Sequence, residues 1–150
     1  MPHRGFTLAE MAIVLAIGAI LLWITVPAVQ AYVQRSRVAQ AVLEIGDMST
    51  KIRQKMKSQG VLPDSLDEAG FAGRVDPWGH PYEYVNLADS KGNGQARKDK
   101  KTNPLNSDFD LYSIGADGKT KPQVTQSDAR DDVIRARDGG FIGLASDFDP

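Results

Sequence analysis

Residues 4–34 read RGFTLAEMAIVLAIGAILLWITVPAVQAYVQ, and this stretch decides how the chain is organised. From Met11 to Gln34 it contains no charged residue over 24 positions. About 20 apolar residues in a helix are enough to cross the hydrocarbon of a bilayer. The chain after Arg35 is polar enough to be water-soluble. The sequence therefore predicts a short N-terminal stub, one membrane segment and a water-soluble body.

Three interpretations of the apolar stretch compete. A secretory signal peptide would use Arg4 as its basic region and residues 29–31 as a cleavage site before Tyr32. The second interpretation is an ordinary signal anchor, and the third is a prepilin whose tiny leader is removed while the helix stays. Signal-peptide cores usually run about 7–15 residues, so the length disfavours the first. Glu10 disfavours the first two, because a carboxylate near the start of an apolar helix is costly without an interface or a partner.

The block from Arg4 to Glu10, followed by the apolar run, resembles the class III signal of type IV pilins and type II secretion pseudopilins. The resemblance implies that a prepilin peptidase cuts between Gly5 and Phe6 and methylates the new amine of Phe6. Glu10 then becomes the fifth mature residue and Pro27 the twenty-second, as in the family. The expected organisation is a leader (1–5), a transmembrane and filament-core helix (6–34), an amphipathic continuation of that helix (35–60) and a periplasmic globular head (61–150).

Physical reasoning supports roles for the same residues. Gly5 has no side chain, so a peptidase can approach the scissile bond closely. In a helical filament the Phe6 ammonium of one subunit can pair with Glu10 of its neighbour, and such pairing is strong where the dielectric constant is low. The alternative is that Glu10 merely extends to the lipid headgroups.

Pro27 is expected to weaken the apolar helix. It cannot donate a hydrogen bond to the Trp23 carbonyl, which predicts a kink or local melting. The resemblance implies that this weak point lets the helix extend when subunits enter a filament. A tolerated kink in a membrane helix explains Pro27 equally well.

Beyond the membrane segment, apolar residues recur at three- and four-residue steps, with charged residues between them. The pattern ends at Gly60, and Pro63 follows as a usual helix stop. One helix from about Phe6 to Gln59 would be about 80 Å long. Its second half presents an apolar stripe against which the rest of the chain must fold, formed by Val38, Val42, Ile45, Met48, Ile52 and Met56.

The remaining residues are rich in turn signals and short strand patterns. Residues 82–85 and 109–114 are predicted strands, and 140–144 is a third candidate. Ser65 and Glu68 form a capping box for one helical turn. Residues 91–103 read as a solvated polar loop with five basic residues and one acid. The fold class is therefore α+β and pilin-like, with a long N-terminal helix packed on a small antiparallel sheet and a loop-rich C-terminal region.

Two blocks of the head carry a narrower resemblance. Residues 76–82 (DPWGHPY) and 108–119 (DFDLYSIGADGK) are similar to ordered blocks of the type II secretion major pseudopilin. From the residues alone, Pro77 and Gly79 predict a tight turn, and Trp78 predicts a large anchor for the core. Residues 135–144 have no assignable counterpart in that family. This departure leaves a related pilus as an alternative.

Acidic residues crowd the C-terminal loops, where Asp117, Asp128, Asp131 and Asp132 fall within 16 residues. Such carboxylates repel one another unless they are solvated, paired with basic residues or bound to a hard cation such as calcium. The resemblance implies calcium in the loop that follows the GADG block. It points to Asp117 as the firmest ligand, then Asp131 or Asp132, and then the Ile114 carbonyl. The alternative is a solvated acidic loop with surface ion pairs.

The composition narrows the function. Eighteen basic and nineteen acidic residues give a net charge of -1, which disfavours nucleic-acid binding. The chain has no cysteine, and its two histidines, His3 and His80, are far apart. These facts disfavour an enzyme, and His80 is interpreted as a residue that caps a turn.

The sequence thus predicts a structural subunit of a periplasmic pseudopilus that drives protein export through the type II secretion system. The alternative is the major subunit of a surface type IV pilus for adhesion or motility. Such pilins commonly carry a C-terminal disulfide, and the lack of cysteine favours the first. The expected location is the bacterial inner membrane, as a single-pass protein with its head in the periplasm. The expected partners are further copies of the chain, minor pseudopilins, the inner-membrane assembly platform, prepilin peptidase and inner-membrane lipid, with no nucleic acid.

Overall fold

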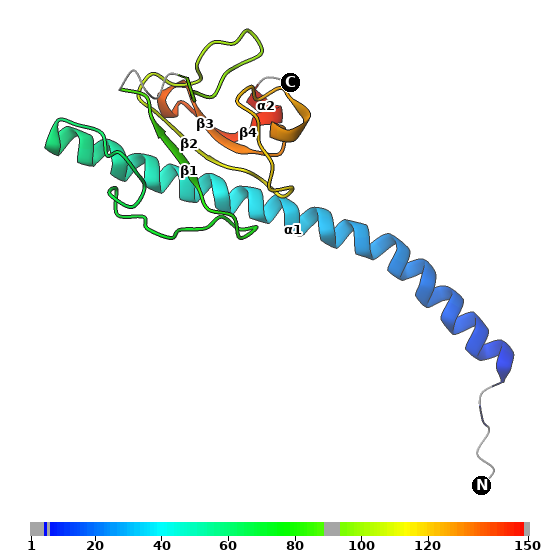
Figure 1. Cartoon of the computed structure of the whole chain (residues 1–150). Helices are drawn as coiled ribbons and strands as arrows, with labels where there is room; N and C mark the ends of the chain where they lie inside the picture. Colours follow the sequence, from blue (N-terminus) through cyan, green and yellow to red (C-terminus); the bar gives the residue numbers. More distant parts are fainter. Residues whose placement is uncertain (1–4, 6, 89–93, 149–150) are drawn as a thin grey trace. The chain divides into compact units, whose positions relative to one another are not determined.

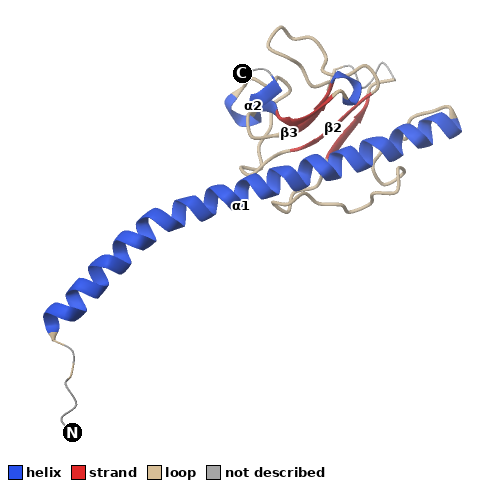
Figure 2. Ribbon diagram, turned by 180° about the vertical axis from the view of Figure 1, so that it is seen from behind, coloured by secondary structure: helices blue, strands red, loops and turns tan. Residues whose placement is uncertain are grey.

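The computed structural model describes residues 5, 7–88 and 94–148, so Phe6 lies outside the described residues. The described chain divides into two compact units, Met1–Ser36 and Arg37–Pro150. Helix α1 (Leu8–Gln59) begins in the first unit and ends in the second. Figure 1 shows the order of the elements along the chain, and Figure 2 shows the same molecule from behind.

Within the first unit, α1 is the predicted apolar helix. It is long and apolar enough to cross a membrane, with a mean hydropathy of 2.5 over its best window. Its large apolar side chains are exposed, including Leu22 (63%) and Trp23 (80%), which suits a surface that lipid or other helices cover. The helix continues through Pro27 without interruption. The local melting that the proline could cause is therefore not present in this structure.

In the second unit, the last part of α1 carries the predicted apolar stripe. Ile45, Met48 and Ile52 are fully buried, and Val38 and Val42 pack against the same core. The helix ends where the sequence indicates. Gly60 adopts a φ of 79°, which a glycine tolerates at a helix C-terminus, and its N–H donates to the Met56 carbonyl at 2.8 Å.

A four-stranded antiparallel sheet, in the order β1-β2-β3-β4, forms the rest of the second unit. The strands are β1 (Glu83–Asn86), β2 (Phe109–Ser113), β3 (Val133–Ala136) and β4 (Phe141–Leu144). Short helical segments η1 (Ser127–Ala129), η2 (Arg137–Gly139) and α2 (Ala145–Phe148) complete the unit. The α+β class and the three predicted strands are confirmed, with β1 shifted by one residue. Strand β3 was not predicted.

The two faces of the sheet bury different clusters. Phe109, Leu111 and Val133 pack against the α1 stripe. Ile134 points to the opposite face, because neighbouring strand residues alternate, and packs there with Ala136 in a second cluster. Partly buried aromatic residues from β4 and α2 also pack on that second cluster. Residues 135–144, which have no assignable counterpart in the resembled family, therefore include the edge strand β4. Phe141 of that strand helps to cover the face of the sheet that points away from α1.

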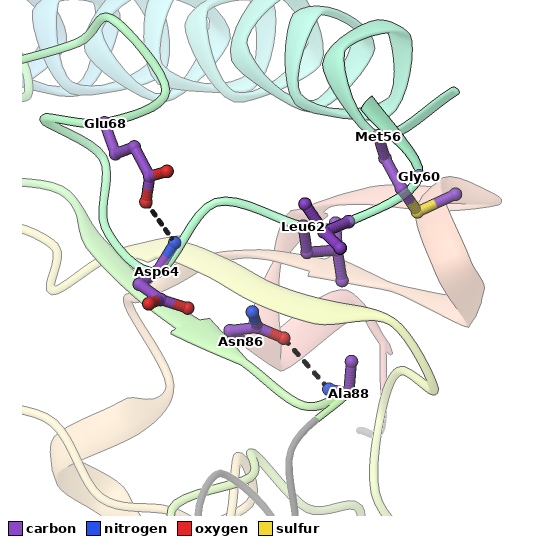
Figure 3. A pocket seen from close by; sticks show the side chains of 8 residues that line it. Met56, Gly60, Leu62, Asp64, Glu68, Asn86 and Ala88 are labelled. Carbon is purple, nitrogen blue, oxygen red and sulfur yellow. Dashed lines mark hydrogen bonds between the residues drawn. The ribbon is translucent and has the colours of Figure 1, made fainter. Parts of the chain in front are cut away.

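The predicted helical turn after α1 is present. The Glu68 N–H donates to Ser65 Oγ at 3.2 Å, as in a capping box. The Glu68 carboxylate returns to the N–H of Asp64, one residue earlier than a standard box, at 2.8 Å. This turn fixes an acidic segment beside the C-terminal end of α1, as Figure 3 shows.

Candidate functional site

The N-terminal end of α1 is closed by Thr7 and Glu10, which form a reciprocal capping box. The Thr7 N–H donates to Glu10 Oε2 at 2.8 Å, and the Glu10 N–H donates to Thr7 Oγ1 at 3.2 Å. The Thr7 hydroxyl also donates to Glu10 Oε2 at 2.9 Å. Gly5 is exposed, and an added Cβ there would meet nothing within 4 Å. Gly5 itself is therefore not crowded by other described residues.

This box gives Glu10 a local structural role that the sequence analysis missed. The signal was present as the Thr-x-x-Glu spacing of residues 7–10, which is the usual pattern of a capping box. Gln at the same position would keep the hydrogen bonds and lose the charge. Glu10 thus combines a helix-capping function with the charge on which the pairing hypothesis rests, and the two can be separated by substitution.

In the head, Asp76 organises the turn of the DPWG block. Its Oδ1 accepts hydrogen bonds from the N–H groups of Trp78 at 3.0 Å and His80 at 2.9 Å. Its Oδ2 accepts from the Ser113 hydroxyl at 2.5 Å. Gly79 completes the turn with a φ of 94°. The predicted tight turn is therefore present, and a buried carboxylate connects it to the end of β2.

The GADG block forms a second turn that contacts the first. The His80 ring nitrogen Nδ1 lies 3.1 Å from the Gly115 carbonyl. Gly115 has a φ of 69°, and a Cβ there would lie 2.6 Å from the Asp131 backbone and carboxylate oxygens. No larger residue fits without a shift of that loop. The two blocks that carried the narrower resemblance thus pack together, and the contacting residues His80 and Gly115 are 35 positions apart in the sequence.

The predicted calcium ligands fall into two groups. Asp131 Oδ2 accepts from the N–H groups of Ala116 at 2.9 Å and Asp117 at 3.1 Å. Asp117 Oδ1 accepts from the Lys119 N–H at 2.8 Å. The structure therefore places the Asp131 carboxylate beside Asp117. Asp117 belongs to the turn that follows Ile114 and Gly115 in the sequence.

Asp132 points elsewhere. Its side chain is fully buried, and its Oδ2 accepts from Arg97 Nη2 at 2.5 Å and from the Thr120 hydroxyl at 2.6 Å. Burial raises the pKa of Asp132 to about 6, against the opposing effect of Arg97. Within residues 5, 7–88 and 94–148, no group of three or more His, Cys, Asp or Glu residues is arranged to hold a metal ion. A cation at Asp117 and Asp131 would therefore need backbone carbonyls and water for its other ligands.

A second buried cation, Arg135, holds α1 on the sheet. Its guanidinium makes a bidentate pair with Asp108, with two distances of 2.7 Å. Its Nε donates to Ser49 on α1 at 2.9 Å, and the group lies 4.0 Å over the Phe109 ring. Ser49 is 86 positions from Arg135 in the sequence, and Asp108 is 27 positions from it. This network was missed because strand β3, which carries Arg135, was not predicted, and a charged residue does not by itself indicate burial.

The comparisons with known proteins agree with this architecture. Residues 1–26 match the family model described as the prokaryotic N-terminal methylation motif. A fimbrial protein of Neisseria meningitidis is 29% identical over 141 residues, which cover 91% of this chain and 81% of the relative. The type II secretion system core protein G of Pseudomonas aeruginosa is 28% identical over 138 residues, which cover 78% and 86%. The fimbrial protein EcpC of Eikenella corrodens is 38% identical over 74 residues, which cover 49% and 48%.

No solved structure is significantly similar to the chain. The methylation motif, the relatives and the long helix packed on an antiparallel sheet confirm the resemblance noted from the sequence. In motif, relatives and architecture the chain is similar to type IV pilin-like proteins. The names of these relatives denote pilus and secretion proteins rather than enzymes, and they include both kinds at similar identity.

Proposed function

We propose that this chain is the repeating subunit of a periplasmic pseudopilus that drives proteins through a type II secretion system. One observation carries the proposal: Asp76 and Ser113, which belong to the two blocks similar to the major pseudopilin, are hydrogen-bonded to each other. Those blocks are therefore parts of one structural unit of the head. The lack of cysteine also favours a pseudopilin over a surface pilin.

In this function the N-terminal segment does the assembling. Prepilin peptidase removes residues 1–5 on the cytoplasmic side and methylates Phe6, and α1 stays in the inner membrane with the head in the periplasm. On entry into the filament, Glu10 leaves the membrane paired with the amine of a neighbouring subunit. Glu10 exchanges its hydrogen bonds with Thr7 for the pairing with that amine, so its carboxylate has a partner both before and after assembly.

We also propose that calcium binds the head at Asp117 and Asp131. The two aspartates are adjacent in the structure, and the Ile114 carbonyl precedes the same turn. A bound cation would neutralise their mutual repulsion and fix residues 115–119 against the 128–132 segment. Asp132 is a weaker candidate, since Arg97 already neutralises it.

The surface type IV pilus remains the second candidate function, favoured by the fimbrial relative that aligns over 91% of the chain. Deletion of the gene in its native host separates the two. A pseudopilin mutant retains exported proteins in the periplasm and keeps its surface pili. Loss of surface pili with normal export would overturn the pseudopilus proposal and favour the pilus.

A further inference from the structure

The hairpin at residues 97–105 presents two lysines at its tip. The Leu105 N–H donates to the Arg97 carbonyl at 2.9 Å, and the Thr102 N–H donates to the Asp99 carbonyl at 3.0 Å. The second bond closes a β-turn with Lys100 and Lys101 at its two central positions. Residues 91–103 were predicted to be a solvated polar loop, of which 91–93 lie outside the described residues. The prediction is wrong at Arg97, which is buried at the base of the hairpin.

The hairpin is also fixed from the side, by the segment at 119–124. The Lys98 N–H donates to the Pro122 carbonyl at 2.8 Å, and the Val124 N–H donates to the Lys98 carbonyl at 3.0 Å. The Gln123 amide donates to the Lys100 carbonyl at 3.0 Å. The fold thus brings two basic stretches side by side. Their lysines are here called the lysine surface, which consists of Lys98, Lys100, Lys101, Lys119 and Lys121.

The lysine surface stands out from a chain whose net charge is only -1. Asp99 is its single interspersed acid, and that carboxylate accepts from Asn103 N at 2.8 Å and Asn103 Nδ2 at 3.0 Å. Because the whole chain is nearly neutral, the rest of its surface carries the compensating negative charge. Copies of the chain can therefore attract one another through unlike surfaces.

A groove at the C-terminal end of α1 has the complementary character. It encloses about 460 Å³, and Figure 3 shows the side chains that line it. Met56, Val61 and Leu62 make one part apolar, whereas Asp64 and Glu68 place carboxylates at the other. A lysine combines an apolar stem with a charged end, so this lining suits a lysine side chain.

The lysine surface and the groove are made of different residues within one copy. Among the described residues, the groove is lined by the end of α1, the segment after it and the end of β1, and no residue of the lysine surface lines it. A contact between them must therefore join two copies through different surfaces. Such a heterologous contact generates an open helical filament where its rotation does not close into a ring.

We propose that Lys101 at the hairpin tip of one copy inserts into the Asp64–Glu68 groove of the next copy. The proposal rests on the function as a filament subunit and assigns one of the contacts between its heads. The lysine stem packs against Met56 and Leu62, and its ammonium pairs with Asp64. Glu68 Oε1 then faces the Lys101 ammonium, while Glu68 Oε2 still accepts the hydrogen bond from the Asp64 N–H.

Cysteine cross-linking tests this contact directly, because the natural chain has no cysteine that could interfere. Filaments are assembled in cells from full-length chains carrying Asp64→Cys and Lys101→Cys, then oxidised and run on non-reducing gels. The proposal predicts a ladder of dimers and higher multimers. The control pair is Asp147→Cys with Lys101→Cys, since Asp147 is exposed and does not line the groove.

Charge reversal provides a second measurement if the cysteine pair assembles poorly. Lys101→Glu is expected to lower the mass of sheared filaments about tenfold, and Lys101→Glu with Asp64→Lys to restore it. Arg130→Glu, with the same change of charge on another exposed residue, should assemble normally. Filaments with no ladder from the groove pair, or normal assembly of Lys101→Glu, would overturn the contact and assign the lysine surface to another partner. Absence of filaments from the wild-type chain would instead overturn the proposed function.

Discussion

The Ser113 hydroxyl donates a 2.5 Å hydrogen bond to the Asp76 carboxylate, joining the end of β2 to the turn before β1. Both side chains are buried, with 0% and 4% of their surface exposed. Asp76 also accepts two backbone N–H groups of its own turn. One carboxylate therefore holds a turn and connects it to the sheet.

Asp76→Ala is expected to destabilise the head by about 2–4 kcal/mol, because it leaves buried donors unpaired and empties a packed site. Chemical unfolding of the full chain in detergent, followed by tryptophan fluorescence, measures this loss. Asp147→Ala, at an exposed position, is the matched control and should change stability by less than about 0.5 kcal/mol. Equal stability of the two variants would contradict the role of Asp76.

Asp132 should make stability depend on pH in a defined window. Burial raises its folded pKa from 3.8 to about 6, so the folded head binds a proton more tightly than the unfolded chain. The stabilisation is fully present below pH 3.8 and is lost as the pH rises through about 6. Between these values the free energy of unfolding of the wild-type chain should fall as the pH rises. It should fall more steeply than that of the Asp132→Asn variant, by up to about 1.4 kcal/mol per pH unit. Parallel curves for the two proteins would contradict this account.

Substitutions of Glu10 can separate its two functions. Glu10→Gln keeps a side-chain acceptor for Thr7 and loses the charge, whereas Glu10→Ala loses both. If pairing with the neighbouring amine drives assembly, both variants are processed and both fail to form filaments. Immunoblots of processing and of sheared filaments measure the two steps. Normal filaments from Glu10→Gln would show that the cap, and not the charge, is what assembly requires.

Calcium should stabilise the head by binding the folded state alone. When free calcium is at about 100 times its dissociation constant, binding adds about 2.7 kcal/mol to the free energy of unfolding. The thermal midpoint of the wild-type chain should therefore be higher with calcium than with chelator. Asp117→Ala and Asp131→Ala should abolish the difference, while Asp128→Ala should retain it. Asp128 is half-buried and lies outside the Asp117–Asp131 pair. Identical wild-type midpoints with calcium and with chelator would remove the proposed site.

Much of the fold followed from local patterns. The helix end at Gln59 and the stripe of Ile45, Met48 and Ile52 were predictable, because helical periodicity and a Gly-Pro stop are local signals. Strand β3 was not, since it is only four residues long and includes the buried Arg135. A short segment with a charge in its middle carries no periodic signal.

The candidate site was predictable to a different extent. Gly5, Phe6 and Glu10 form one contiguous motif, which is why sequence alone could indicate processing and assembly. The groups that hold the head together come from distant positions: Arg97 pairs with Asp132, and Arg135 with Ser49 on α1. Such pairings depend on the tertiary fold. Only the structure could show that Asp131 lies beside Asp117 while its neighbour Asp132 faces the interior.

The central claim is that the chain is a prepilin whose apolar helix is retained after cleavage beside Gly5. Mass spectrometry of the protein extracted from membranes of its native host tests this most directly. The account predicts a mature chain that begins at N-methylated Phe6, after loss of residues 1–5. A mature chain that begins at Tyr32, or an uncleaved chain that begins at Met1, would contradict it.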